Sequence, residues 1–316
     1  MLSLIVPVYR NEQGLEDLLL AVSKLAQGET HGFECVFVVD GSPDRCYEKL
    51  RESLPRQPFA SQLLLHSRNF GSFAAIRTGL KAARGTCYAV MAADLQEPPE
   101  LVETMSRVLH ADEADVVIGV RNGRDDPMPG RLMADLYWSF YRRYVVPEMP
   151  EGGVDIFGCN RAFRDSLLKM REAHSSLVAQ VFWLGFRRKA IPYARRARVH
   201  GKSAWSFRKK FEYMLDSIFA FTDLPIRLLM RAGLVVSMAS VLFALALVVA
   251  RLGGWIVVPG YAMTMITIVF FGAVNLFALG VVGSYAWRAY ENSKQRPLHV
   301  ILTRHSWRPI AATHHD

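Results

Sequence analysis

The residues best suited to chemistry in this sequence lie in the stretch Met91–Glu100, which reads MAADLQEPPE. Asp94, Gln96 and Glu97 bring three oxygen-bearing side chains together directly after an apolar run typical of a buried strand. Oxygen ligands of this kind suit Mg²⁺ or Mn²⁺, and such an ion can carry a diphosphate group. Pro98-Pro99 predicts the start of a helix, because proline presets the backbone angle of a first helical turn. Taken alone, the stretch fits equally well a helix N-terminus with acidic residues in its first turn.

The elements that position this stretch follow from an alternation of short apolar runs with amphipathic segments along residues 2–120. The runs predicted as strands are Leu2–Val8, Glu34–Val39, Gln62–His66, Cys87–Met91 and Asp115–Val120. The segments predicted as helices are Gly14–Leu25, Asp44–Leu54, Ser72–Ala83 and Pro99–Leu109. This alternation predicts an α/β domain built on a parallel, doubly wound sheet with helices on both faces. No GxGxxG sequence follows the first strand, which argues against a dinucleotide-binding version of this fold.

Polar residues collect where each of the first four predicted strands ends. Tyr9 and Glu12 follow the first strand, Asp40 the second, Arg68 the third and Asp94 the fourth. Ligands of open α/β sheets bind at the carboxyl ends of the strands. The convergence of acidic side chains on this one edge therefore predicts a binding site.

Four motifs at these strand ends, PVYRNE, VDGSPD, SRNFG and ADLQEPPE, resemble the inverting family-2 glycosyltransferases in order and separation. The likeness is strongest to the polyprenyl-phosphate glycosyltransferases, and it covers nearly the whole chain. It implies a GT-A type fold that binds a nucleotide-diphosphate sugar, with UDP-sugars favoured. By this resemblance Asp94 and Gln96 would hold Mg²⁺ or Mn²⁺ at the diphosphate. The residues assigned to nucleotide binding are Pro7, Tyr9, Glu12, Asp40, Ser42 and Arg68.

Two departures from the family pattern bear on the metal. Ala92 stands where the family usually has the first aspartate of Asp-x-Asp, and Val39 stands where it often has a second aspartate before Gly41. A lost carboxylate weakens the binding of a hard cation. One protein carboxylate, the sugar diphosphate and water are nevertheless an ordinary ligand set for Mg²⁺, so we expect a working site.

Further candidate residues follow the fifth predicted strand. Arg121 and Arg131 flank a charged, glycine- and proline-broken loop that fits either a solvated connector or a phosphate-binding segment. In the family, a loop at this place receives the acceptor phosphate. Asp155 aligns with an aspartate near the acceptor. A lipid phosphate is already anionic at neutral pH, so Asp155 is expected to position the acceptor or stabilise positive charge on the sugar rather than act as a base.

A second basic cluster, residues 195–205, matches a family segment of the form Arg-x-x-Gly-Glu-Ser-Lys-Tyr. Arg198 and Ser203 match that segment and are predicted to bind the acceptor phosphate, whereas Lys202 and Ala204 depart from it. The same cluster also fits a basic patch at a membrane surface.

The later part of the chain predicts a membrane protein. Hydrophobic residues make up 51% of the sequence and the net charge is +9, which suits an acidic partner. A catalytic domain at 1–206 is expected to precede an amphipathic interface helix at 207–231, two transmembrane helices at about 232–252 and 261–287, and a loosely ordered basic tail at 288–316. The distribution of arginine and lysine predicts a multi-pass protein of the inner membrane with its catalytic domain and both termini in the cytosol.

The resemblance implies transfer of a sugar to a polyprenyl phosphate, with undecaprenyl phosphate expected, and inversion at the sugar. A catalytically silent scaffold that binds nucleotide sugars is the alternative, supported by Ala92 and Val39 alone. A processive polysaccharide synthase is disfavoured because the chain lacks a Gln-x-x-Arg-Trp sequence and has too few membrane helices. A nucleic-acid-binding protein would leave the acidic strand ends unexplained. The sequence leaves the sugar and the oligomeric state open, and the resemblance is compatible with a homo-oligomer.

Overall fold

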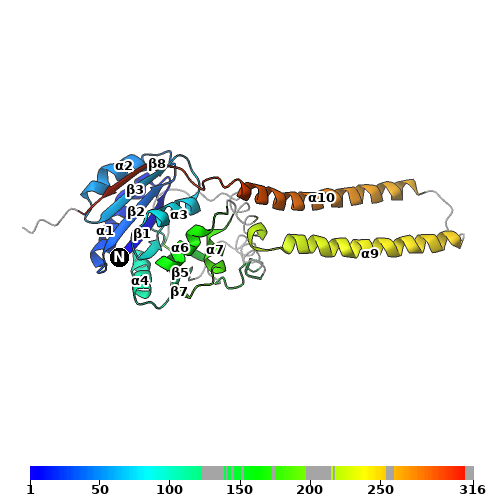
Figure 1. The fold of residues 1–316 in the computed structure, drawn as a ribbon, viewed down its shortest axis with the longest axis horizontal. Coiled ribbons are helices and arrows are strands. Elements are labelled where there is room, and N and C mark those ends of the chain that lie inside the picture. The colour runs from blue at the N-terminus through cyan, green and yellow to red at the C-terminus, as the bar shows by residue number, and fades with distance from the viewer. Residues whose placement is uncertain are drawn as a thin grey trace, which may run out of the picture.

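The structure is a computed structural model that describes residues 1–122, 139, 141–143, 146–150, 153–172, 175–196, 215, 218–253 and 260–309. Its centre is a sheet whose described strands run in the order β7-β5-β6-β4-β1-β2-β3-β8 (Figure 1). The strands are β1 (Leu2–Val8), β2 (Phe33–Val39), β3 (Ala60–His66), β4 (Cys87–Val90), β5 (Val116–Arg121), β6 (Val154–Asn160), β7 (Arg188–Tyr193) and β8 (Ile301–Trp307).

The sheet is mixed, which corrects the prediction of a wholly parallel one. Strands β1 to β4 are mutually parallel, but β6 lies antiparallel between β4 and β5, and β8 pairs antiparallel with β3. Strand β6 begins at the edge where β5 ends and runs back along it, so no crossover helix is needed. As a result, the ends of β5 and β7 and the start of β6 share the edge formed by the carboxyl ends of β1 to β4.

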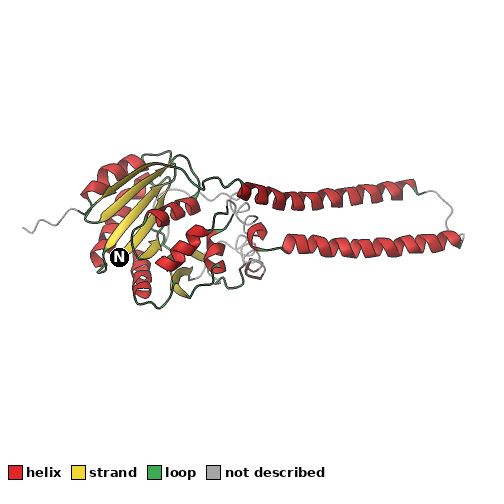
Figure 2. Ribbon diagram, in the orientation of Figure 1, coloured by secondary structure: helices red, strands yellow, loops and turns green. Residues whose placement is uncertain are grey.

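Helices cover both faces of this sheet, as the alternating sequence pattern predicts (Figure 2). One face packs against α1 (Leu15–Gly28), α2 (Cys46–Ser53) and α4 (Pro99–His110). The other packs against α3 (Ser72–Ala82), α6 (Arg161–Lys169) and α7 (Leu177–Trp183). Short 3-10 turns lie at Glu12–Gly14 and Leu54–Arg56. The predicted strands and helices of the first 120 residues are confirmed, with ends that differ by up to three residues.

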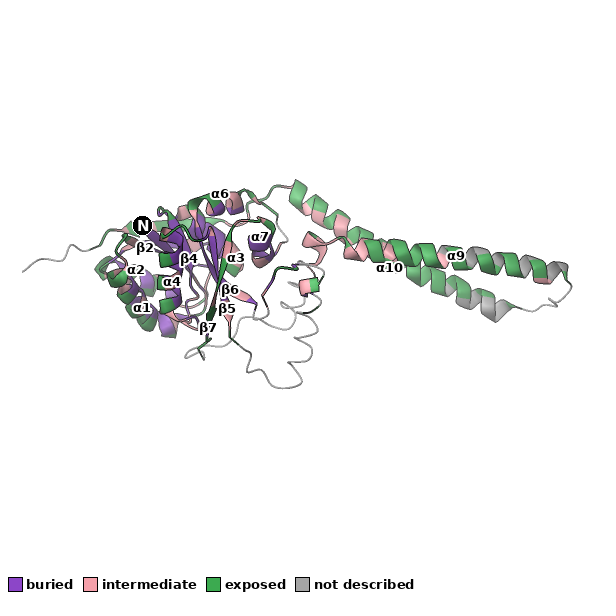
Figure 3. Cartoon of the chain, turned by 90° about the horizontal axis from the view of Figure 1, so that it is seen from below, coloured by how far each residue is buried: buried purple, intermediate pink, exposed green. Residues whose placement is uncertain are grey.

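Two long helices, α9 (Leu224–Leu252) and α10 (Tyr261–Ser293), leave the domain side by side (Figures 1 and 3). At 1.5 Å per residue they are about 44 and 50 Å long. Their described apolar side chains face outward, with Leu242 and Leu276 at 68% and 72% exposure. Among the described residues, Phe270–Ser293 is the segment long and apolar enough to cross a membrane. Of the predicted interface helix, residues 207–214 lie outside the described chain, and α9 already begins at Leu224.

The described part of the tail beyond α10 contains a strand, which corrects the prediction of a loosely ordered segment for those residues. Residues 301–307 form β8 along the outer edge of β3. Arg304 donates a hydrogen bond to Gln62 Oε1 at 2.8 Å. The hydroxyl of Tyr47 bonds Thr303 Oγ1 at 2.9 Å and His305 Nε2 at 3.0 Å. The sequence does contain a signal for this strand, because Ile301–Trp307 includes β-branched and aromatic residues. The prediction instead followed the basic composition of the tail.

The direction of the strands relates the sheet to the helix pair. In Figures 1 and 3 the N-terminus, which leads into β1, lies at the end of the domain away from α9 and α10. The carboxyl ends of β1 to β4 therefore face the side from which the two helices leave.

Candidate active site

The loop that follows β3 is fixed by Asp40, which lies at the end of β2 and is 2% exposed. The Asp40 carboxylate accepts hydrogen bonds from the backbone N–H groups of Phe70 and Gly71, each at 2.8 Å. His66 Nδ1 lies 2.8 Å from Oδ1 of the same carboxylate. Asp40 was predicted to bind the nucleotide, and in the structure its oxygens face the protein and hold residues 67–71.

Gly41 and Ser42 continue this arrangement. Gly41 adopts a φ of +55°, and a Cβ at this position would lie 2.2 Å from the carbonyl carbon of Arg68. Only glycine can therefore bring the loop after β2 this close to the loop after β3. Ser42 Oγ accepts a hydrogen bond from the backbone N–H of Arg10 at 2.8 Å and donates one to Asp44 Oδ1 at 2.6 Å. The predicted nucleotide residue Ser42 thus joins the loops after β1 and β2.

Glu12 binds the N-terminal end of α2. Its Oε2 accepts a hydrogen bond from the backbone N–H of Arg45, and Lys49 Nζ lies 3.2 Å from Oε1. The bond from Arg45, with help from Lys49, lowers the pKa of Glu12 below its usual range. Glu12 is therefore a carboxylate that secures the loop after β1.

The other predicted nucleotide residues line the same edge. Pro7 pairs with Val38 in the sheet, and the half-buried Tyr9 follows it, with the Arg10 guanidinium 5.4 Å from the Tyr9 ring. Arg68 is exposed and its guanidinium lies 4.1 Å from the centre of the Phe70 ring. Tyr9 and Arg68 are thus an aromatic ring and a cation presented at the edge, groups that suit a nucleotide base and a phosphate.

The Asp94 loop is held between its neighbours. Asn11 Nδ2 donates to the carbonyl oxygen of Ala93 at 2.8 Å, which ties the loop after β1 to the loop after β4. Leu95 takes a left-handed φ of 52°, so the chain turns sharply here. Gln96 Oε1 accepts a hydrogen bond from Arg195 Nη2 at 2.6 Å. The predicted metal ligand Gln96 is therefore linked to the segment after β7, while Asp94 is half-buried beside it.

Glu97 is the buried acid of this loop, at 2% exposure. Its Oε2 finds no hydrogen-bond partner within the described part of the chain. Burial, together with the negative charges of Asp94 and Asp155, raises the pKa of Glu97 to about 7. An unpaired oxygen beside a second carboxylate fits the oxygen donor set of Mg²⁺ or Mn²⁺. The site is thus able to supply a second carboxylate despite Ala92.

Arg121, Asp155 and Tyr193 form a compact cluster at the same edge. Nε and Nη2 of Arg121 both donate to the Asp155 carboxylate, which also accepts a hydrogen bond from the Tyr193 hydroxyl. Burial alone would raise the pKa of Asp155, but the hydrogen bonds and charge of Arg121 outweigh it and hold that pKa below the usual range. Asp155 is therefore ionised at neutral pH, and it fixes the orientation of Arg121.

The structure brings together Asp94, Arg121 and Asp155 on one side of the edge and the predicted nucleotide residues on the other. The predictions for Arg131, Arg198 and Ser203 lie outside the described residues. Sequence reasoning missed Tyr193, and it included Arg195 only as a member of the basic cluster 195–205, without its contact to Gln96. The signal for Tyr193 was that β7, like β5, ends at this edge, and that depends on a strand pairing that no local pattern reveals.

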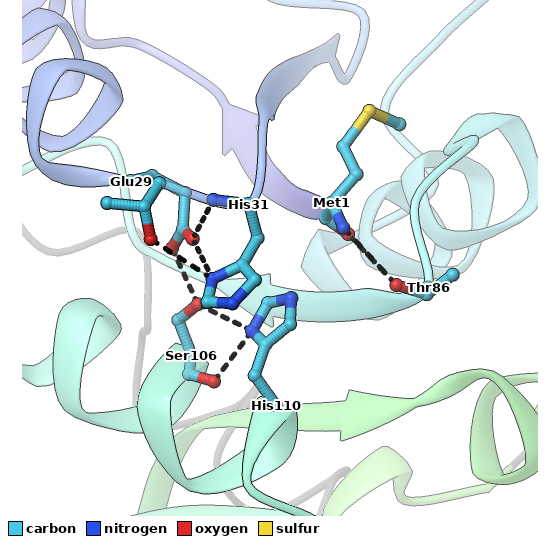
Figure 4. Close-up of polar contacts among 7 residues, drawn as sticks. Met1, Glu29, His31, Thr86, Ser106 and His110 are labelled. Carbon is cyan, nitrogen blue, oxygen red and sulfur yellow. Dashed lines mark hydrogen bonds and ion pairs between the residues drawn. The ribbon is translucent and has the colours of Figure 1, made fainter.

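A separate group, Glu29, His31 and His110, lies near the start of β1, at the opposite edge of the sheet (Figure 4). It borders a cavity of about 290 Å³. The two imidazole rings stack with centroids 4.1 Å apart and an interplanar angle of 16°, so their in-plane lone pairs do not converge on one point. Ser106 Oγ donates to Glu29 at 2.6 Å, and His110 Nδ1 lies 2.9 Å from the carbonyl oxygen of Ser106. This group is a hydrogen-bonded contact between α1 and α4, distinct from the metal site predicted at Asp94.

Comparison with known proteins identifies the family. The model of glycosyl transferase family 2 matches residues 3–171. The chain is 30% identical to the putative glycosyltransferase CsbB of Bacillus subtilis, over 95% of this chain and 91% of that protein. It is 31% identical to the undecaprenyl-phosphate 4-deoxy-4-formamido-L-arabinose transferase of Pseudomonas paraeruginosa, over 94% and 88%. It is 28% identical to the bactoprenol glucosyl transferase of Shigella phage SfV, over 95% and 97%.

Among solved structures, the mannosyltransferase PcManGT of Pyrobaculum calidifontis, in complex with GDP-Man and Mn²⁺, superposes with a TM-score of 0.51. The match covers 92% of this chain and 84% of that one at 17% identity, and so it shows the fold alone. The fold is of the GT-A type. With residues 3–171 matched to the family and relatives that align over nearly its whole length, the chain belongs to glycosyltransferase family 2 and is an enzyme of the glycosyltransferase type.

Proposed function

We propose that this enzyme transfers a sugar from a nucleotide-diphosphate sugar, with UDP-sugars favoured, to a polyprenyl phosphate at the membrane surface, with inversion of the sugar. One observation carries the proposal. The sheet edge that holds Asp94, Arg121 and Asp155 faces the side from which α9 and α10 leave the domain. A catalytic edge turned toward two helices with outward apolar side chains suits an acceptor whose phosphate is fixed at a bilayer surface. Relatives named for undecaprenyl phosphate and bactoprenol support the same acceptor class.

A two-helix membrane hairpin, at about 232–252 and 261–287, is part of the proposal. The contacts at its base support it, because the Tyr285 hydroxyl donates to the carbonyl oxygen of Thr222 at 3.1 Å and the Phe219 and Tyr285 rings lie 5.1 Å apart. Strand β8 returns to the domain after α10, so the chain leaves and re-enters on one side. This supports an inner-membrane protein with the 1–206 domain and both termini in the cytosol, and the apolar helix surface is long enough for a hydrocarbon core of about 30 Å.

The chain's own residues have distinct parts in the reaction. The acceptor phosphate oxygen attacks the anomeric carbon, and the bond from that carbon to the nucleoside diphosphate breaks. Asp155 accepts from Nε–H and one N–H of Nη2 of Arg121, so both N–H groups of Nη1 and the second N–H of Nη2 are the ones that this pair leaves for a phosphate. The ionised Asp155 orients this guanidinium and also supplies negative charge near a sugar carbon that becomes positive. Because the acceptor is already anionic, no residue is required as a general base.

The metal in this proposal is held by Asp94, with Glu97 and Gln96 as the neighbouring oxygen donors. Bound Mg²⁺ or Mn²⁺ would neutralise charge on the departing diphosphate. Glu97 suits this task because its Oε2 is buried and unpaired in the described chain, whereas Gln96 Oε1 already accepts a hydrogen bond from Arg195. Arg131, Arg198 and Ser203 remain candidates for the acceptor phosphate on sequence grounds.

The test is a transfer assay with the purified full-length protein, undecaprenyl phosphate and a panel of UDP-, GDP- and dTDP-sugars. Each donor is assayed with Mg²⁺, with Mn²⁺ and with EDTA, and Asp94→Asn and Asp155→Asn are run beside the parent. We expect a lipid-linked sugar that forms only with metal and is lost in Asp94→Asn. Transfer to water or to a soluble acceptor but never to the lipid, across the whole panel, would overturn the proposed acceptor. Full transfer in EDTA would overturn the metal assignment.

A further inference from the structure

We infer that the chain segment leaving α10 is a structural part of the donor-nucleotide site, in which His66 and His299 are positioning residues that hold the loop 67–71 through Asp40. The inference rests on the proposed function in one respect, the assignment of this edge to a nucleotide. It adds a tail and a stacked histidine pair that lie outside the four motifs found in the sequence.

The first step of the argument is the buried pair of Asp40 and His66. Both side chains are almost wholly enclosed, at 2% and 1% exposure. His66 Nδ1 contacts Asp40 Oδ1, and His66 Nε2 lies 2.8 Å from Thr78 Oγ1 in α3. The imidazole therefore links β2 to α3, and its position determines where the Asp40 carboxylate can lie.

The second step is what Asp40 holds. Its other two hydrogen bonds come from the N–H groups of Phe70 and Gly71, the last residues before α3. Gly71 has a φ of +96°, and because glycine has many backbone conformations open to it, the hydrogen bonds to the carboxylate help to select this one. The same loop carries the exposed Arg68, whose backbone packs against Gly41. A displaced Asp40 would thus move the cation and the glycine turn that form the nucleotide edge.

The third step is the contact from the tail. The His299 ring stacks on His66 with centroids 5.4 Å apart and an interplanar angle of 16°. Next to it, the Val300 carbonyl oxygen accepts a hydrogen bond from the backbone N–H of Ser67 at 3.0 Å. Strand β8 then pairs along β3, with its register shifting at Leu65 and His66, directly beside this contact. The tail therefore closes over the outer side of the buried pair.

The charge state of His299 fits a packing role. Burial, followed by electrostatic interaction with the His66, Lys81 and Arg77 side chains, lowers the pKa of His299 to about 4. A neutral ring can stack on His66 without repulsion across the physiological pH range. The contact also joins two parts of the molecule. Residues 294–300 alone separate α10, a helix proposed to span the membrane, from the loop that positions the donor.

The experiment measures binding of UDP, GDP, CDP, ADP and dTDP to the full-length protein with Mn²⁺ by calorimetry, together with KM for the donor, kcat and the melting temperature. His299→Ala removes the stacking ring and His299→Phe keeps a ring. His66→Gln loses the donor to Asp40, whereas His66→Asn keeps a donor near the position of Nδ1. Thr303→Val is the matched control, because it lies on β8 away from loop 67–71 and Tyr47 retains His305 as a partner.

We expect His299→Ala and His66→Gln to weaken binding of the preferred nucleotide and raise KM by about tenfold, with kcat changed less than twofold. His299→Phe and Thr303→Val should bind as the parent does, whereas His66→Asn, which keeps the donor to Asp40 but loses the ring that His299 stacks on, should weaken binding less than His66→Gln does. Nucleotide binding equal to that of the parent in folded His299→Ala would overturn the role of the tail. An equal loss of nucleotide affinity in Thr303→Val would show that the tail acts only through the stability of the whole domain. Nucleotide binding that depends on His299 without any transfer to lipid would leave this inference standing and refute the proposed function. A parent that binds none of the five nucleotides would refute both.

Discussion

Glu97→Gln should stabilise the metal-free protein, and the gain should grow with pH. The fold accommodates the neutral acid, since burial and the charges of Asp94 and Asp155 raise the pKa of Glu97 from 4.5 to about 7. A group with a raised folded-state pKa contributes stability below its unfolded pKa and loses it as pH rises through the folded value. At 1.36 kcal/mol per pKa unit, the cost of Glu97 relative to a neutral side chain is about 1 kcal/mol at pH 5.5 and about 3 kcal/mol at pH 8.5.

The assay is thermal unfolding of the full-length protein in EDTA at several pH values. At about 2 °C per kcal/mol for a chain of this size, the advantage of Glu97→Gln in melting temperature should rise from about 2 °C at pH 5.5 to about 6 °C at pH 8.5. Glu100→Gln is the control, because Glu100 is an exposed acid three residues further on, in the first turn of α4, and should show no such trend. Added Mn²⁺ should shrink the difference, since a nearby cation favours the ionised acid. A pH-independent difference between Glu97→Gln and the parent would refute the reasoning.

Three further outcomes follow from buried features. Gly41→Ala should lower stability by more than about 2 kcal/mol and weaken nucleotide binding, because its Cβ would overlap the backbone of Arg68 at a positive φ; calorimetry and melting curves measure both. Glu34→Ala should cost about 3 kcal/mol in denaturant unfolding, because this buried carboxylate accepts hydrogen bonds from two side chains and one backbone N–H. A thiol reagent should label the native protein only slowly, because all four cysteines are buried and the pKa values of their thiols are raised: Cys35, Cys46, Cys87 and Cys159. Rapid labelling would contradict this.

The fold of the first 120 residues could be predicted from sequence because its strands are buried on both faces. Such strands read as continuous apolar runs, and the helices between them carry apolar residues at a spacing that matches one buried side. Strand β6 could not be placed in this way, because its direction depends on which neighbours it pairs with. Strand β8 was not predicted for a different reason: its pairing partner β3 lies more than 200 residues earlier in the chain.

The sequence was enough to predict where the candidate site lies, but not which contacts its side chains make. Motif positions brought Asp94, Arg121 and Asp155 to one edge, and the structure has them there. That Asp40 faces inward to His66 could not be predicted, because an aspartate at a strand end has the same sequence context whether it binds a ligand or a loop. The raised pKa of Glu97 likewise depends on burial by elements distant in sequence.

The position of β8 also constrains how the protein is made. Its sheet partner is synthesised early, but β8 itself emerges from the ribosome only after both long helices. The edge of β3 must therefore stay uncovered by β8 until α9 and α10 have been synthesised. An unpaired strand edge is prone to pairing with other chains, so the nascent protein carries an aggregation hazard throughout that interval. Strand β8 removes the hazard when it pairs with β3, and it ties completion of the catalytic domain to completion of the helix pair.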